Sequence, residues 1–179
     1  MKSRRHIVSA LLAAALFAIS AASQTPRVTV DYTLSVKRPV SHIYDIEMEI
    51  SGIRSTSIEV AMPAWSPGEY RIRDFARNVQ EFSAETSKNA RLPWRQVDKQ
   101  TWRVAKSAGD DVRIHYRLYS PDLVDELADI NSAATFMYVV GQVPHPVTVG
   151  IKMSPNWSSI AASLDPVSPD KPNTLAAPD

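Results

Sequence analysis

The side chains that most often carry out chemistry are scarce and scattered in this sequence. It contains no cysteine and four histidines, so disulfides, thiolate metal sites and a cysteine nucleophile are excluded. None of His6, His42, His115 and His145 has a glutamate beside it or another histidine four positions away, and no serine lies in a Gly-x-Ser-x-Gly turn. A catalytic zinc needs three protein ligands and an open position. We therefore predict no catalytic residue and no metal-binding residue in this chain.

One group of carboxylates deserves separate treatment because its members lie at a spacing of two. Asp45, Glu47 and Glu49 alternate with Ile46, Met48 and Ile50. Paired carboxylates are the groups that hydrolyse glycosidic bonds. Strict alternation with apolar residues is, however, typical of a strand with one face in solvent. We favour the solvated face as the explanation.

The charge balance limits the partners of the chain. Twenty lysines and arginines oppose 19 aspartates and glutamates, for a formal net charge of +1. Such a balance leaves no positive field to attract nucleic acid or an anionic membrane. We predict no nucleic-acid partner.

The first 22 residues have the three parts of a secretory signal peptide. Basic residues near Arg4 precede an apolar stretch from Ile7 to Ile19, and Ser20-Ala21-Ala22 follows it. We predict cleavage after Ala22, with Ser23 as the alternative. The apolar stretch is shorter than the roughly 20 residues that span a bilayer, so we expect an exported protein, periplasmic or secreted, with no membrane anchor after cleavage. The pair Arg4-Arg5 leaves twin-arginine export open.

The elements that position any site are predicted to be strands. Segments with a period of two recur every 8 to 12 residues and end at turn-forming residues, which is typical of a sandwich of two sheets. We therefore predict an all-β, antiparallel two-sheet β-sandwich over residues 27–164. The strands are expected at Val28–Val36, Asp45–Ile50, Ile58–Met62, Val79–Glu85, Leu92–Val97, Thr101–Ala105, Val112–Tyr119, Phe136–Val140 and Val147–Met153.

Two segments depart from the strand pattern. Ser120-Pro121 is a suitable start for a helix, so one short helix is expected at about residues 121–130, with Leu123, Leu127 and Ile130 as its buried side. Residues 165–179 are rich in proline and poor in apolar side chains, which predicts an extended linker.

The most informative stretch runs from Met62 to Val79. Pro63 ends a strand, and Ser66-Pro67-Gly68 predicts a turn in which Pro67 presets φ and Gly68 supplies a positive φ. Trp65 and Tyr70 flank this turn, and we expect them to pack over it. Taken alone, the stretch indicates a β-turn pinned by two aromatic residues, with its arginines in solvent or in surface ion pairs.

The stretch also carries a resemblance. The run from Pro63 to Val79, Pro-Ala-Trp-Ser-Pro-Gly-Glu-Tyr-Arg-Ile-Arg-Asp-Phe-Ala-Arg-Asn-Val, is similar to the signature of the N-terminal domain of the glycyl aminopeptidase family of zinc metallopeptidases. Residues 29–36 and 43–50 resemble the first two strands of that domain. Residues 98–104 and 112–119, and Pro155-Asn156-Trp157 followed by Leu164, match further blocks, so the likeness covers about residues 28–164. Residues 123–132 are more acidic than the family pattern.

The resemblance implies that zinc binding and catalysis belong to a different domain from the one in this chain. Members of the family are thermolysin-like, often with a PDZ-like module, and bind zinc through a His-Glu-x-x-His helix in a catalytic domain that lies downstream of the domain seen here. It implies that this chain is a non-catalytic accessory domain, a fragment or truncated product whose zinc and peptide substrates belong to a catalytic domain of the same or an adjacent polypeptide. We expect the interface with that domain, near its cleft, to include Trp65, Tyr70, Arg71, Arg73 and Arg77.

A second hypothesis stays open. The chain is then a free-standing exported β-sandwich that binds a ligand or a protein through an aromatic and arginine patch at Trp65, Tyr70 and Arg71. The reading frame beyond Asp179 distinguishes the two hypotheses, since only the first requires a His-Glu-x-x-His sequence there.

Overall fold

A computed structural model of the protein describes residues 27–142 and 145–177. The predicted signal peptide and the cleavage site after Ala22 lie outside these residues. The described elements are strands β1 (Thr29–Ser35), β2 (Ile43–Ser51), β3 (Ser57–Ala61), β4 (Val79–Thr86), β5 (Trp94–Gln96), β6 (Thr101–Ala105), β7 (Val112–Tyr119), β8 (Tyr138–Val139), β9 (Val147–Lys152), β10 (Asp165–Pro166) and β11 (Thr174–Ala177), with 3-10 helices η1 (Pro39–Ser41) and η2 (Phe75–Asn78) and helix α2 (Ser132–Thr135).

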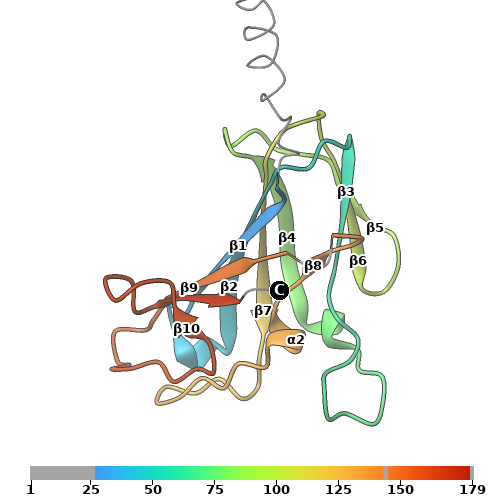
Figure 1. Ribbon diagram of the computed structural model, residues 1–179. Coiled ribbons are helices and arrows are strands. Elements are labelled where there is room, and N and C mark those ends of the chain that lie inside the picture. Colours follow the sequence, from blue (N-terminus) through green and yellow to red (C-terminus); the bar gives the residue numbers. More distant parts are fainter. Residues whose placement is uncertain (1–26, 143–144, 178–179) are drawn as a thin grey trace, which may run out of the picture.

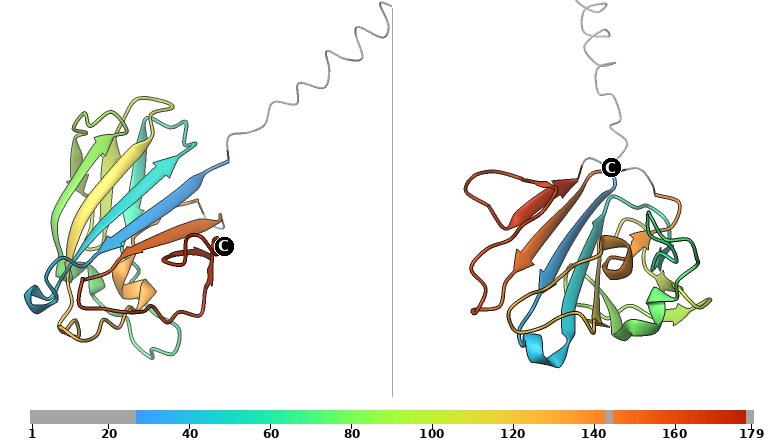
Figure 2. Two further views of the ribbon diagram at one scale, coloured as in Figure 1. Left: turned by 90° about the vertical axis from the view of Figure 1, so that its left-hand side faces the viewer. Right: turned by 90° about the horizontal axis from the view of Figure 1, so that it is seen from below.

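The strands form two sheets, which confirms the predicted sandwich (Figure 1). The larger sheet has the order β10-β11-β9-β1-β2-β7-β4 and the smaller one β5-β6-β3-β8. All described pairs are antiparallel except β1 with β9, which is parallel. The strands of the larger sheet fan out with the usual twist (Figure 2).

The core lies between the two sheets and is built by the alternation seen in the sequence. Ile46 and Met48 of β2 are fully buried, as are Val60 of β3 and Val104 of β6. Two phenols tie the segment before β8 to the larger sheet: the Tyr32 hydroxyl donates to the Met137 carbonyl (2.6 Å) and the Tyr116 hydroxyl to the Thr135 carbonyl (2.8 Å). Burial raises the pKa of both phenols, so they act as neutral donors.

The expected helix at residues 121–130 does not form. The Val124 N–H donates to the Leu127 carbonyl (3.0 Å), which is opposite to the direction of a helical hydrogen bond. Leu123 is fully buried but Leu127 is 62% exposed, so the apolar stripe is not continuous. The Trp157 indole N–H donates to the Asp125 carbonyl (2.7 Å) and holds this segment as a loop. Aspartate is also a poor helix former.

The only described α-helix instead begins one residue after Asn131. The side chain of Asn131 accepts hydrogen bonds from the N–H groups of Ala133 and Ala134, which is the standard N-cap arrangement. The helix spans only Ser132–Thr135, and it packs against η2.

The expected linker at residues 165–179 is also wrong for the part that the structure describes. Strand β11 pairs with β9, and β10 pairs with β11, so the larger sheet continues through Ala177. Leu175 is buried against it. The prolines fit this role because Pro166 lies in the outermost strand, where no partner needs its missing N–H, and Pro169 and Pro172 lie in the connecting turns.

Within the described residues, no helix combines the length and apolar character that a membrane crossing requires.

Candidate functional site

The segment from Pro63 to Asp74, here called the motif loop, projects from one end of the sandwich. It connects β3 to η2 and is seen at the lower right of Figure 1. It contains no regular secondary structure, so its shape depends on its own hydrogen bonds.

The centre of the motif loop is the predicted turn. The Glu69 N–H donates to the Ser66 carbonyl (3.0 Å), with Pro67 and Gly68 at the two central positions. Gly68 has φ +88°, which confirms the positive φ predicted from the sequence. A β-carbon at Gly68 would meet no atom within 4 Å. The glycine is therefore required by backbone conformation and not by lack of space.

A second set of contacts staples the two arms of the loop together. The Arg73 guanidinium forms two hydrogen bonds with the Glu69 carboxylate (3.0 and 2.9 Å), and the Arg73 N–H donates to the Ala64 carbonyl (2.7 Å). The Trp65 indole N–H donates to the Glu69 carbonyl (2.7 Å). The hydrogen bonds from Arg73 lower the pKa of Glu69, and Glu69 raises the pKa of Arg73. Arg73 thus closes the loop on itself.

The loop is also joined to the body of the domain. Ser66 is buried, and its hydroxyl oxygen lies 3.4 Å from Asn131 Nδ2, the side chain that caps α2. Ala76 of η2 is buried in the core. The motif loop therefore has a defined position with respect to α2.

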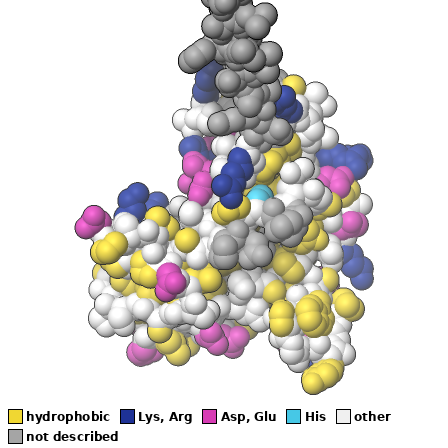
Figure 3. All heavy atoms as spheres, viewed as in Figure 1, with side chains coloured by type: hydrophobic (Ala, Val, Ile, Leu, Met, Phe, Trp, Pro, Cys, Tyr) yellow, Lys and Arg dark blue, Asp and Glu magenta, His cyan; other side chains and the backbone are white. Residues whose placement is uncertain are grey.

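In contrast to these fixed parts, the tip of the loop turns apolar side chains to solvent. Trp65 is 49% exposed, Ile72 77% and Tyr70 fully exposed. Figure 3 shows the resulting cluster of hydrophobic side chains at the lower right of the molecule. Trp65 packs along the turn as expected, through its indole hydrogen bond, but Tyr70 does not pack over it. Exposed large apolar side chains that gather in one place usually mark an interaction site.

The five predicted interface residues therefore separate into three groups. Trp65 and Tyr70 are both exposed in the motif loop, and Arg71, next to Tyr70 in the chain, is exposed without an ion-pair partner among the described residues. Arg73 is engaged within the loop. Arg77 lies beyond the loop in η2, at the border of a groove.

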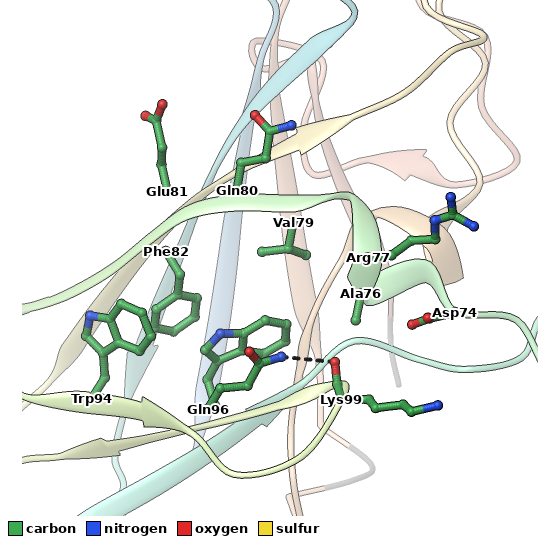
Figure 4. A pocket seen from close by; sticks show the side chains of 11 residues that line it. Asp74, Ala76, Arg77, Val79, Gln80, Glu81, Phe82, Trp94, Gln96 and Lys99 are labelled. Atoms are coloured by element: carbon green, nitrogen blue, oxygen red, sulfur yellow. Dashed lines mark hydrogen bonds between the residues drawn. The ribbon is translucent and has the colours of Figure 1, made fainter.

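This groove was not predicted from the sequence. It has a volume of about 470 Å³ and lies between β4 and the β5–β6 pair (Figure 4). Its floor contains Phe82, Trp94 and Trp102, which come from three different strands. The available signal was the pair of tryptophans in two neighbouring short strands, but only the tertiary structure brings Phe82 between them.

The carboxylates of β2 belong to a paired surface, here called the charged face: the outward side chains of β2 and β7 and their partners on β4. Arg113 contacts Glu49 (2.9 Å), Glu85 (3.1 Å) and Glu47 (3.8 Å). The same face holds Arg117, Asp45, Glu81 and His115. This pairing agrees with the predicted solvated face and leaves no pair of free carboxylates for acid–base chemistry on β2.

The histidines are not gathered into a metal centre. The His115 imidazole lies 3.7 Å from Asp45 and is bordered by Arg117 on the same face. Across residues 27–142 and 145–177, no three His, Asp or Glu side chains are grouped in a way that would hold a metal ion.

Comparison with known proteins gives one family and one fold. The sequence model of the peptidase M61 N-terminal domain matches residues 31–179. An aminopeptidase N family protein from Idiomarina loihiensis has a similar fold, with a TM-score of 0.76 and 23% identity over 84% of this chain and 27% of that chain. An M1 zinc metallopeptidase from Deinococcus radiodurans matches with a TM-score of 0.42 and 12% identity, over 84% of this chain and 38% of that chain. No curated protein matches. The chain spans little more than a quarter of the Idiomarina protein.

Proposed function

Because this chain belongs to the peptidase M61 N-terminal domain family, we propose that it is the non-catalytic domain of an exported zinc aminopeptidase of the glycyl aminopeptidase type. In this proposal the motif loop docks on the catalytic domain and forms part of the wall of its substrate cleft. Zinc and the peptide substrate are bound by the catalytic domain.

The observation that carries the proposal is the contrast within the motif loop. Its backbone is held by the Ser66–Glu69 turn and the Glu69–Arg73 staple, whereas Tyr70 and Ile72 between them are almost entirely in solvent. A rigid loop loses little conformational freedom on binding, so apolar side chains at its tip contribute more fully to affinity. Aromatic side chains are also enriched among the residues that dominate interfaces.

The arginines take different roles in this proposal. Arg71 contributes its guanidinium to the interface, since planar guanidinium groups suit bidentate bonds to carboxylates. Arg73 positions the loop through Glu69 and is not itself available for bidentate contact with a partner. Arg77 borders the groove, so its contacts are expected to differ from those of Arg71.

Export of the protein is part of the proposal and is supported by the leader. A basic start, an apolar stretch and the small residues before Ala22 are the features that a signal peptidase recognises. A periplasmic or secreted location also suits an enzyme that acts on peptides outside the cytoplasm.

The first test is the reading frame beyond Asp179. The proposal requires a downstream zinc-binding domain with a His-Glu-x-x-His helix, on the same polypeptide or a neighbouring one. A frame and neighbourhood without such a sequence would overturn the docking proposal and leave the free-standing binding module.

The second test uses the peptidase that contains this domain. The double substitution Tyr70→Ser and Ile72→Ser is expected to lower kcat/KM on glycyl amide substrates at least about tenfold, because it removes the apolar anchors of the interface. The melting temperature of the isolated 179-residue chain should stay unchanged, since neither side chain is packed.

Val40→Ser is the matched control for this test. Val40 in η1 is 63% exposed and β-branched like Ile72, but lies outside the motif loop. It should leave kcat/KM unchanged. Equal losses from Val40→Ser and from the double variant, or no loss from either, would show that the motif loop is not the docking surface.

A further inference from the structure

The groove beside η2 arises because two consecutive strands begin as a pair and then separate. Near their connection β4 and β5 form a hairpin, with the Leu92 N–H donating to the Ala84 carbonyl (2.9 Å) and the Thr86 N–H to the Ala90 carbonyl (2.8 Å). Farther along, β4 becomes the edge of the larger sheet and β5 the edge of the smaller sheet. The groove lies in the space between these two edges.

Three aromatic rings contact one another in turn across this space, with Phe82 in the middle. Phe82 lies parallel to Trp102, with centroids 5.4 Å apart and an interplanar angle of 10°, and contacts Trp94 edge-on at 4.8 Å. Trp102 and Phe82 are buried, whereas Trp94 remains 43% exposed. The exposed Trp94 ring therefore packs against buried Phe82, which in turn lies on buried Trp102. Figure 4 shows Phe82 beside Trp94.

Polar side chains complete the lining beyond the three aromatic rings. The Gln96 amide lies beside these rings and donates to the Lys99 carbonyl (3.0 Å), which fixes its orientation (Figure 4). Asp74, Arg77 and Lys99 also line the groove. None of these three charged side chains has an ion-pair partner among residues 27–142 and 145–177.

We propose that this groove binds a neutral oligosaccharide, with one sugar ring lying on the exposed face of Trp94. A pyranose has an apolar face of C–H groups and an edge of hydroxyl groups. It therefore suits a rigid aromatic surface next to side chains that donate and accept hydrogen bonds. The volume of about 470 Å³ is within the range of small-ligand sites.

The charges in the groove favour a neutral ligand over an ionic one. The lining contains two cationic side chains, Arg77 and Lys99, and two carboxylates, Asp74 and Glu81. The groove therefore has no electrostatic potential of one sign that would attract an anion or a cation. The carboxylates of the lining also favour binding of the sugar over its hydrolysis. Glu81 is already bound by Arg117 (2.9 Å). Asp74 is then the single carboxylate of the lining without an ion-pair partner in the described part of the chain, whereas glycosidases need two. This inference does not depend on the proposed docking of the motif loop.

Titration of the full chain with cellotetraose, maltotetraose and chitotetraose tests the proposal, with tryptophan fluorescence and calorimetry as readouts. We expect at least one of them to bind with a dissociation constant of about 1 mM or tighter. Trp94→Ala should weaken that binding at least about tenfold, and Trp94→Phe should weaken it less because a flat ring remains. Lys99→Met should also weaken it, because methionine has no hydrogen-bond donor in place of the ammonium group.

Tyr138→Ala is the matched control. Tyr138 is a partly exposed aromatic residue on β8, the opposite edge strand of the same sheet, and its removal should leave binding unchanged. Melting curves of each variant show whether the domain remains folded. Absence of binding of all three sugars up to about 10 mM, or equal weakening by Trp94→Ala and Tyr138→Ala, would overturn the proposal. Binding of unrelated peptides in the groove, with no sugar bound, would overturn it as well.

Discussion

The charged face and the motif loop are both exposed and rich in arginine, yet their side chains are in opposite situations. On the charged face, Arg113 contacts three glutamates and the Asn89 side chain, and Arg117 contacts Glu81 and Asp45. In the motif loop, Arg73 is the one arginine with an ion pair among the described residues, and Tyr70 and Ile72 are largely in solvent. The arginines of the charged face are paired with its own carboxylates, whereas the apolar side chains at the tip of the motif loop are left in solvent.

This difference shows what kind of exposure indicates function. An exposed arginine on a strand is explained when its neighbours across the sheet are carboxylates. An exposed tyrosine and isoleucine on a stapled loop have no such local explanation, since a flexible or more polar loop would be easier to accommodate in solvent. Function is therefore better sought where a rigid surface leaves its apolar groups unsatisfied.

The largest expected effect on stability comes from substituting a glycine at the end of β2, Gly52, and is compared with the same substitution at Gly68 in the motif loop. Gly52 (φ +83°) and Gly68 (φ +88°) have nearly the same backbone conformation. A β-carbon at Gly52 would lie 2.5 Å from the Arg27 carbonyl oxygen. Gly52→Val should lower the free energy of unfolding by about 2–6 kcal/mol, from strain plus displaced backbone. Gly68→Val should lower it by about 1–3 kcal/mol, from strain alone.

Denaturant unfolding of the two variants measures this difference. Equal losses of unfolding free energy would mean that the backbone at Arg27 moves aside at little cost when Gly52 gains a side chain. The end of β2 would then be less rigid than the close contact at Gly52 indicates. An unchanged stability in Gly68→Val would mean that the turn shifts to a type that accepts a side chain.

A smaller effect separates the arginines of the two regions. Arg113→Ala should lower the free energy of unfolding by about 1 kcal/mol, because it removes several partly exposed ion pairs at once. Arg71→Ala should leave it unchanged, because Arg71 has no ion-pair partner in the part of the chain that the structure describes. Added salt should reduce the difference between the two variants. A loss in Arg71→Ala as large as that in Arg113→Ala would contradict the distinction drawn here.

The smallest effect concerns the staple of the motif loop and its dependence on pH. The pKa of Glu69 is lowered from its usual 4.5 by the hydrogen bonds from Arg73. The contribution of the staple is therefore fully present above pH 4.5 and is lost as the pH falls through the lower pKa of the folded state. The NMR signal of the Trp65 indole N–H, which is bound to the Glu69 carbonyl, should shift in that acid range.

Glu69→Gln provides the control for this measurement, since it keeps the size of the side chain and removes its titration. The Trp65 signal of this variant should be insensitive to the same change in pH, and the signal of the buried Trp102 should not shift in either protein. A Trp65 shift that persists in Glu69→Gln would show that another group controls the loop.

Much of the strand framework could be predicted because a strand with one buried face alternates apolar and polar residues along the sequence. Residues 112–119 alternate between buried apolar and outward polar positions, and every strand predicted from such alternation is found. The Pro67-Gly68 turn was predicted for a similar reason, since its φ angles depend on the two residues themselves. These features are local.

The errors arose where local signals were overruled by distant contacts. Residues 121–130 carry a helix-like start, but Trp157 binds the backbone at Asp125 and holds the segment as a loop. Residues 165–177 read as a linker because proline is common there, but β9 offers an edge with which β11 pairs. The Arg73–Glu69 pair is a local exception: the two residues are only four positions apart, but they meet because the Ser66–Glu69 turn folds the loop back on itself.

The sequence by itself determined the sandwich class, most of the strands, the positive φ of Gly68 and the segment that carries the family signature, because each depends on residues close together in the chain. Only the tertiary structure decided which exposed side chains remain without partners and where the groove lies. Those properties depend on residues such as Phe82, Trp94 and Trp102, which come together only when β4 and β5 separate into different sheets. A contact between distant residues produces no periodic pattern in a single sequence. It forms because it is favourable in the packing of the whole fold.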